Sequence, residues 1–237
     1  DAPNNFLINI QPEERASIAG IFESANIDEP SFVPMVRARM QTINGEDVKT
    51  REYPAEGGEW MANREQNLTW AQALSSSNEI VKGEWWPADY DGEPLVSLEE
   101  DAAADLGVEI GDKLQFFIAG QEISLTVSSF RTINWDSFQP NFFMVLSPGA
   151  LDGFPSTFVA SLKIAEGDKD VLWKLVRQHP TVSVIDIETI LQQVKSIIDK
   201  ATLAVQAVFV FTLLAGIAVL FAAVQSTIDE RRFESAM

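Results

Sequence analysis

Few residues in this chain of 237 could carry out chemistry. There is no Cys and a single His, His179, so neither a thiolate nucleophile nor an ordinary zinc site is expected. His179 precedes Pro180 at the end of a predicted helix, where a cation is favourable for structure alone. The sequence contains neither the Gly-x-Ser-x-Gly turn of hydrolases nor a Gly-rich loop that would cradle phosphate. We therefore expect no enzyme activity, no bound ATP and no cofactor in this chain.

An acidic stretch, DYDGEPLVSLEE (89–100), spaces its carboxylates as a calcium loop does. Positions 1, 3, 5 and 12 of such a loop are matched by Asp89, Asp91, Glu93 and Glu100. Position 6 requires Gly for a sharp turn, but here it is Pro94, whose φ is fixed at about −65°. We interpret the stretch as a solvated acidic loop that precedes a helix.

Large aromatic residues are the other candidate feature, and five of the six Trp residues lie between residues 46 and 153. Trp135 and Phe143 are flanked by strand patterns, and we interpret them as core residues. Trp85 and Trp86 are adjacent, so in an extended chain their side chains point in opposite directions and one is expected to be exposed. The pair is a candidate hydrophobic contact surface, with packing inside a small subdomain as the alternative.

Two β-α-β patterns frame these residues. The first combines the strand NNFLINIQ, a helix opened by Pro12 and a strand that ends at the hairpin signal Asn44-Gly45. The second combines STFVASLKI, the helix KDVLWKLVRQH and the strand TVSVIDIE. The expected fold class is α+β, namely a split β-α-β (ferredoxin-like, porter-type) domain with residues 1–45 and 154–187 as its halves.

The segment between the two halves, residues 46–153, is predicted to form an inserted small β-rich subdomain. Ser97 and Glu100 have the spacing of a capping box, which predicts a short helix that continues to Leu106 and ends at Gly107. Two alternating strands joined near Ala119-Gly120 follow this helix.

The C-terminal part reads as one long helix. Residues 201–228 carry no formal charge, and 24 of them would span roughly 36 Å, enough to cross a hydrocarbon core of about 30 Å. Residues 188–200, which we call the stalk, continue the helix upstream on an apolar stripe. The stripe consists of Ile190, Leu191, Val194, Ile197 and Ile198. We therefore expect a helix from about residue 188 to 228, with residues 201–228 in the membrane.

Charge is distributed unevenly along the chain. Residues 1–200 contain 15 Lys and Arg against 32 Asp and Glu, whereas residues 201–237 contain two against three. The net charge of −18 argues against a nucleic acid partner. An acidic domain of this kind is easily tolerated outside the cytoplasm, where we place residues 1–200. The chain begins without Met and ends within a charged helical pattern, so we interpret it as a fragment of a longer membrane protein.

Several stretches together resemble one family. The chain is similar to the second extracytoplasmic domain and following helix of YbbP-type permeases. The stretches that carry this similarity are DAPNNFLINIQP, VRARMQTING, LTW, INWDSFQPNFFMVLSPGAL and the C-terminal segment from TLAVQ to ESAM. These permeases are placed in the FtsX-like/MacB-like superfamily of ABC transporters. The resemblance covers essentially the whole chain, and NWDSFQPNFF is among its more specific parts.

The resemblance implies a multi-pass permease of the bacterial inner membrane with residues 1–200 in the periplasm. It implies a separate ABC ATPase subunit as a partner, and a mechanism of mechanotransmission that acts on lipid or other hydrophobic cargo. The YbbP type is associated with a periplasmic thioesterase/lysophospholipase, a further candidate partner. Residues 229–237 would begin the cytoplasmic segment that contacts the ATPase. Its polar contacts would be Asp229, Glu230, Arg231, Arg232 and Glu234.

Two other functions are compatible with a domain, a stalk and a membrane helix. One is the extracytoplasmic sensor domain of a signalling receptor, which would differ from a permease in the segments that follow residue 237. The other is an anchored hydrolase, against which the sequence shows no nucleophile and base at recognisable spacing.

Overall fold

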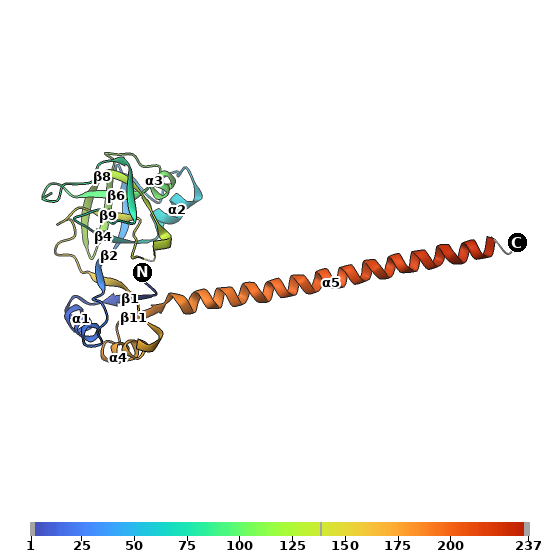
Figure 1. Ribbon diagram of the computed structural model, residues 1–237. Helices are drawn as coiled ribbons and strands as arrows, with labels where there is room; N and C mark the ends of the chain where they lie inside the picture. The colour runs from blue at the N-terminus through green and yellow to red at the C-terminus, as the bar shows by residue number, and fades with distance from the viewer. Residues whose placement is uncertain (1–2, 138, 235–237) are drawn as a thin grey trace. The chain divides into compact units, whose positions relative to one another are not determined.

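The structure is a computed structural model that describes residues 3–137 and 139–234, without the side chains of 136, 166 and 221–234. It divides into two compact units, residues 1–186 and 187–237. The first unit is mixed α/β and the second is one long helix (Figure 1). The elements of the first unit are β1 (Asn5–Ile10), η1 (Pro12–Glu14), α1 (Arg15–Ser24), β2 (Ser31–Ile43), β3 (Glu46–Asp47), α2 (Glu56–Asn63), β4 (Glu65–Trp70), β5 (Asn78–Gly83), β6 (Leu95–Glu99), α3 (Glu100–Leu106), β7 (Lys113–Ile118), β8 (Gln121–Ile133), η2 (Trp135–Ser137), β9 (Met144–Leu146), β10 (Thr157–Leu162), η3 (Glu166–Asp168), α4 (Asp170–Gln178) and β11 (Ser183–Asp186).

One part of the first unit is a four-stranded antiparallel array in the order β11-β1-β10-β2. It is built from both ends of the unit, because β1 and β2 precede residue 45 and β10 and β11 follow residue 156. Helices α1 and α4 contact each other and pack on this array (Figure 1). The buried core that they share consists of Leu7, Ile10, Ile18, Ile21, Phe22, Ala160, Leu162, Ile164, Leu175 and Val182.

The other part of the first unit is a barrel-like sheet. Strand β2 continues past Met35 and pairs there with β4 on one side and with β7 on the other. Strand β4 pairs with β9, β9 with β6, β6 with β8, and β8 with β7, so the ring of six strands closes. Two of these pairs, β4–β9 and β6–β8, are parallel. Strand β2 therefore belongs to both parts of the unit.

The local signals for turns and helix ends are mostly confirmed. Asn44-Gly45 and Ala119-Gly120 have positive φ values and join β2 to β3 and β7 to β8. Helix α3 ends at Gly107, which has φ 64° in the left-handed region. The expected cap at Ser97 is wrong, because this residue lies in β6 and its Oγ accepts a hydrogen bond from Ser129.

Glu99 caps α3 instead. Its side chain accepts a hydrogen bond from the main-chain N–H of Ala102 at 2.7 Å. The strand therefore continues two residues further than the capping-box spacing suggested, and the helix begins directly after it.

The second unit is α5 (Ile187–Glu234), a single helix of 48 residues. The sequence predicted a start near residue 188, and the structure agrees, but α5 continues to Glu234 rather than ending near residue 228. In the described part of the chain it is the one helix long and apolar enough to cross a membrane, over residues 187–220. All its side chains from 189 to 220 are exposed within this chain. A mixed α/β domain followed by a long apolar helix is thus confirmed.

Candidate functional site

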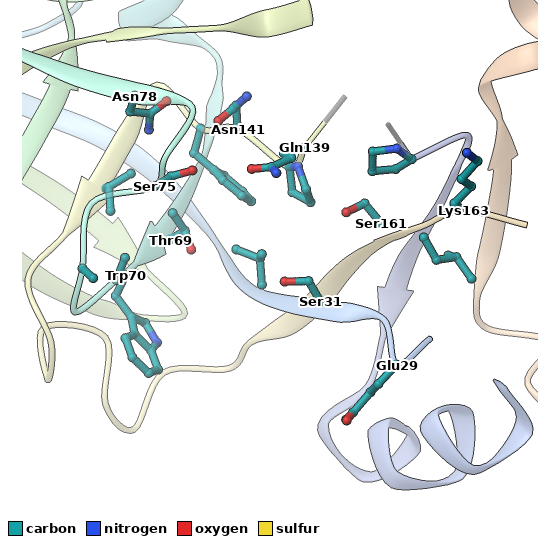
Figure 2. A pocket seen from close by; sticks show the side chains of 18 of the residues that line it. Glu29, Ser31, Thr69, Trp70, Ser75, Asn78, Gln139, Asn141, Ser161 and Lys163 are labelled. Carbon is teal, nitrogen blue, oxygen red and sulfur yellow. The ribbon is translucent and has the colours of Figure 1, made fainter. Parts of the chain in front are cut away.

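The first unit contains a cleft of about 690 Å³ (Figure 2). Its lining comes from chain segments that are far apart in sequence: residues 28–33, 69–78, 139–145 and 161–163, with Pro3 and Trp85. The volume falls within the ~300–1,000 Å³ typical of small-molecule sites. We take this cleft as the candidate functional site because polar and apolar side chains from both parts of the unit converge on it.

One wall of the cleft is formed by the four-stranded array. Ser31 on β2 and Ser161 on β10 are direct cross-strand partners. Ser161 lies between Ala160 and Leu162, which pack in the helix-covered core, so its side chain points to the opposite face of the sheet. Ser161 is only 9% exposed. Among the residues that the structure describes, neither serine hydroxyl has a side-chain hydrogen-bond partner.

The facing wall comes from the end of β4 and from residues 139–145. Thr69 donates a hydrogen bond to the carbonyl oxygen of Pro34 at 2.6 Å, which orients its hydroxyl. The Asn141 amide nitrogen lies 3.3 Å from Ser137 Oγ, and its carbonyl oxygen accepts from Ser77 Oγ at 3.4 Å. These contacts fix the wall so that Asn141 and its neighbours line the cleft (Figure 2).

A buried arginine anchors this wall from inside the barrel. Arg131 on β8 is fully buried, and its guanidinium donates to the carbonyl oxygens of Phe142, of Phe143 at 3.4 Å and of Ser97 at 2.8 Å. Burial lowers the pKa of Arg131 to about 10, because it disfavours the cation, and the nearby Glu99 carboxylate partly opposes this. Arg131 therefore holds the main chain of the cleft wall to the barrel core.

The sequence analysis missed Arg131, although the chain contains a signal for it. Leu125 and Val127 are buried on β8, and residues 129 and 131 continue the same phase of alternation. A cation on the buried phase of a strand indicates an internal hydrogen-bonding role. The acceptors are main-chain carbonyls, which carry no mark in the sequence.

The two adjacent tryptophans lie in different environments. Trp86 is 4% exposed and its indole N–H donates to the carbonyl oxygen of Ala71 at 2.9 Å. Trp85 is half-buried, lines the cleft, and stacks on Trp86 with ring centroids 3.9 Å apart. A role of the pair in hydrophobic contact stays a prediction, and Trp85 is the member whose side chain reaches the cleft.

Other aromatic side chains are more exposed than the strand patterns suggested. Trp135 was expected in the core but is 50% exposed, because it lies in the short helix η2 outside the barrel. From there its ring contacts the half-buried Phe143, with 5.2 Å between the ring centroids. Trp70, 39% exposed, lines the cleft directly.

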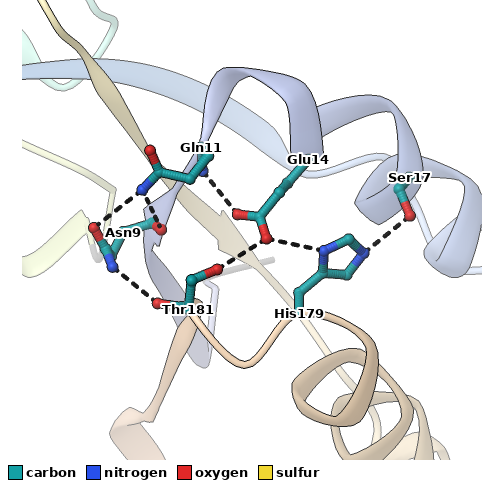
Figure 3. Close-up of polar contacts among 6 residues, drawn as sticks. All are labelled: Asn9, Gln11, Glu14, Ser17, His179 and Thr181. Atoms are coloured by element: carbon teal, nitrogen blue, oxygen red, sulfur yellow. Dashed lines mark hydrogen bonds and ion pairs between the residues drawn. The ribbon is translucent and has the colours of Figure 1, made fainter.

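A second polar cluster joins the two β-α-β segments (Figure 3). His179 Nδ1 lies 3.1 Å from Glu14 Oε1, and His179 Nε2 lies 2.9 Å from Ser17 Oγ. The Glu14 carboxylate also accepts hydrogen bonds from Thr181 Oγ at 2.8 Å and from the main-chain N–H of Gln11 at 2.9 Å. Burial raises the pKa of Glu14, but these hydrogen bonds outweigh it and hold the pKa below the usual 4.5.

This cluster resembles the serine, histidine and carboxylate arrangement of hydrolases, and the sequence analysis did not find it because 162 residues separate Ser17 from His179. Neither of these two side chains lines the cleft. Glu14 is also committed to the capping box that begins η1. The contacts therefore tie the start of α1 to the turn between α4 and β11.

The remaining candidate residues are placed as follows. In the acidic stretch, Tyr90 donates a hydrogen bond to the carbonyl oxygen of Glu93, and Glu100 begins α3. Within residues 3–137 and 139–234, no group of three or more His, Cys, Asp or Glu side chains could hold a metal ion. The stalk residues Ile190, Leu191, Val194, Ile197 and Ile198 all lie on α5 and are 47–66% exposed. The predicted ATPase-contacting residues, Asp229, Glu230, Arg231, Arg232 and Glu234, lie on the helical backbone of α5, and their side chains are outside the described part.

The chain is similar to a known protein over nearly its whole length. The chain is 37% identical over 235 residues, 99% of its length, to the uncharacterised ABC transporter permease YbbP of Escherichia coli K12, and it spans 28% of that protein. No protein-family model matches the chain.

Two solved structures match the chain at low similarity. A domain of a proposed permease from Porphyromonas gingivalis is 10% identical with a TM-score of 0.38, over 78% of this chain and 93% of that one. A proposed lipoprotein from Bacillus anthracis is 11% identical with a TM-score of 0.32, over 77% and 96%. Neither likeness supports an inference about function. The sequence identity, in contrast, relates nearly the whole chain to a segment of an ABC transporter permease of the YbbP type, which confirms the resemblance noted above.

Proposed function

We propose that this chain is the extracytoplasmic domain and following membrane helix of an ABC transporter permease of the FtsX-like/MacB-like type, in the bacterial inner membrane. The identity to YbbP supports a permease over a sensor receptor. In this proposal the chain is non-catalytic, and a separate ATPase subunit hydrolyses ATP in the cytoplasm. Residues 1–200 lie in the periplasm, residues 201–228 cross the membrane, and residues 229–237 begin the segment that contacts the ATPase.

One observation carries the proposed mechanism. Strand β11 ends at Asp186 and α5 begins at the next residue, so the two elements follow each other directly in the chain. The 48 residues of α5 correspond to about 72 Å of continuous helix. Because β11 is hydrogen bonded to β1 in the sheet, a displacement of α5 acts on the sheet itself. The stalk would thus transmit motion between the ATPase side and the first unit.

The strand order supports the split organisation that we propose for the first unit. A ferredoxin-like layer consists of two β-α-β segments whose strands interleave in one antiparallel sheet. The order β11-β1-β10-β2, with α1 and α4 packed on the sheet, is compatible with this arrangement. We propose residues 1–45 and 154–187 as the two halves and residues 46–153 as the insertion, with β2 extending from the first half into the barrel.

The cleft and its surroundings are the proposed working surface of the domain. Transport would reshape this surface around lipid, other hydrophobic cargo, or a periplasmic partner such as a thioesterase or lysophospholipase. Trp85, which lines the cleft, is the proposed contact of the Trp85–Trp86 pair.

The proposed transmission of motion is tested by breaking the helix within the stalk. In the full-length permease co-produced with its ATPase, Lys174→Cys on the exposed side of α4 would carry an environment-sensitive fluorophore. Val194→Pro removes a helical hydrogen bond and clashes with the preceding turn. We expect ATP hydrolysis to continue in this variant while the ATP-dependent fluorescence change is lost.

Val194→Ala is the matched control, because it also shortens the side chain but keeps the helix, and it should retain the fluorescence change. Ile197→Pro, one turn further along, should behave as Val194→Pro does. An unchanged fluorescence response in the two Pro variants would contradict the transmission of motion through the stalk.

A further inference from the structure

We infer that the cleft of the first unit binds a neutral saccharide, held by uncharged hydroxyl and amide side chains and by aromatic rings. The inference goes beyond the transport function proposed above and rests on it only for the cellular side on which the ligand is met. It is carried by the kind of polar group that lines the cleft, by the apolar surface between these groups, and by the ligands that the lining would reject.

Most polar side chains of the lining are uncharged, and some of them make no hydrogen bond within the described part of the chain. Ser31 and Ser161 lie side by side on neighbouring strands and face the cleft, and Gln139 extends from the opposite wall (Figure 2). Within the described part of the chain, none of these three side chains has a hydrogen-bond partner of its own. Ser161 is more than nine-tenths buried, so its free hydroxyl is a built feature of the cleft wall. Hydroxyl and amide groups both donate and accept, as the hydroxyl groups of a sugar do.

Apolar surface alternates with these groups. Val33 and Val145 contribute aliphatic surface, and Phe142, Trp70 and Trp85 contribute aromatic surface. A sugar ring has an apolar C–H face and a rim of hydroxyl groups, so it needs this combination. Aromatic rings supply large contact area at a low cost in side-chain entropy.

An acyl chain is a poorer match for the same lining. It would cover Ser31, Ser161 and Gln139 without giving them hydrogen-bond partners. Of these three side chains only Ser161 is buried, and leaving a buried hydroxyl without a partner costs about 1–3 kcal/mol. The lining therefore selects against a purely hydrocarbon ligand.

An anion is also a poor match. The ionisable groups of the lining are Asp28, Glu29 and Lys163, which together are net negative. A neutral ligand that hydrogen bonds to side chains remains the best fit.

The test uses the full chain in lipid nanodiscs without an ATPase. It is screened on an array of neutral oligosaccharides of glucose, mannose, galactose and N-acetylglucosamine, and the strongest binder is titrated by calorimetry. Trp70→Ala and Ser161→Ala should each weaken binding about tenfold, since one removes an aromatic platform and the other a buried hydroxyl. Both substitutions shorten the side chain without introducing charge, and Trp70 is partly exposed, so the fold should tolerate them.

The matched controls are Trp173→Ala and Ser183→Ala, which remove the same side chains at exposed positions outside the cleft. Both should bind as the parent does. Binding of lysophosphatidylcholine or inorganic phosphate without any neutral oligosaccharide would overturn the inference, and so would saccharide binding that is equal in the cleft variants and the controls. Because the assay contains no ATPase, its outcome is independent of whether the stalk transmits motion.

Discussion

Removing the buried Arg131 side chain should destabilise the first unit more than removing any exposed arginine. Arg131→Ala takes three donated hydrogen bonds away from the carbonyl oxygens of Ser97, Phe142 and Phe143. It also removes the cation near the Glu99 carboxylate, which is 7% exposed. A buried acceptor left without a donor costs about 1–3 kcal/mol, which for the three carbonyls gives a total on the order of 3–5 kcal/mol because that of Phe143 keeps the N–H of Glu99 as a donor.

This cost converts into a measurable change in melting temperature. For a domain of this size, 1 kcal/mol shifts the midpoint by roughly 2–4 °C, so Arg131→Ala should lower it by roughly 6–20 °C. The midpoint can be followed in detergent micelles by tryptophan fluorescence, because Trp135 contacts Phe143 at the anchored segment. Arg37→Ala is the control, since the Arg37 side chain is 66% exposed and lies 4.0 Å from Glu65. An exposed pair of this kind contributes about 0–1 kcal/mol.

A second set of variants separates the charge from the volume. Arg131→Met keeps most of the volume but leaves the carbonyl acceptors unpaired, at about 1–3 kcal/mol for a buried acceptor. Adding Glu99→Gln removes the uncompensated charge while keeping an acceptor for the N–H of Ala102, so the double variant should recover part of the loss. The reasoning fails if Arg131→Ala melts within about 2 °C of the parent, or if the double variant is no more stable than Arg131→Met.

Two further predictions concern the same unit. The pKa of Glu14 is held below 4.5, so its contribution to stability should be present above pH 4.5 and be lost as the pH falls through the lower folded-state value. The difference in melting temperature between the parent and Glu14→Gln should therefore disappear on acidification. A difference that stays constant between pH 7 and 3 would contradict this. Gly83→Ala should destabilise the first unit more than Gly120→Ala does. Both glycines have positive φ, which costs Ala about 1–2 kcal/mol of backbone strain, but only at Gly83 would the added Cβ overlap the Ser128 carbonyl. Equal melting temperatures of the two variants would rule out the overlap.

The elements that were predicted correctly are those encoded by neighbouring residues. The Asn44-Gly45 hairpin, the end of α3 at Gly107 and the start of α5 each depend on one or two residues with a strong local preference. The β-α-β segments were found because alternation and helical periodicity are visible within ten residues. These local signals place the strands but say little about which strands pair.

Closure of the barrel was not predicted, because it depends on contacts between distant segments. Strands β4 and β9 pair in parallel although more than 70 residues separate them. Helix α2 was missed for a related reason, since Gly57 and Gly58 disfavour a helix locally. A Cβ on Gly58 would overlap the main chain of Asp105, so the glycine permits close contact between α2 and the end of α3. Tertiary packing here overrides local propensity.

The cleft and its anchor escaped the sequence analysis for a physical reason that also links them. For Gln139 and Asn141 to present their side chains to the cleft, the wall that carries them must be held in place from behind, and the carbonyls of Phe142 and Phe143 turn toward the barrel interior. Buried carbonyls need donors, and an apolar residue at position 131 would fill the space without supplying any. One long, branched donor that reaches three carbonyls meets this need, at the cost of burying a cation. The polar character of the cleft therefore depends on a charged side chain in the barrel core, and Arg131→Met should weaken ligand binding at the cleft even under conditions where the domain remains folded.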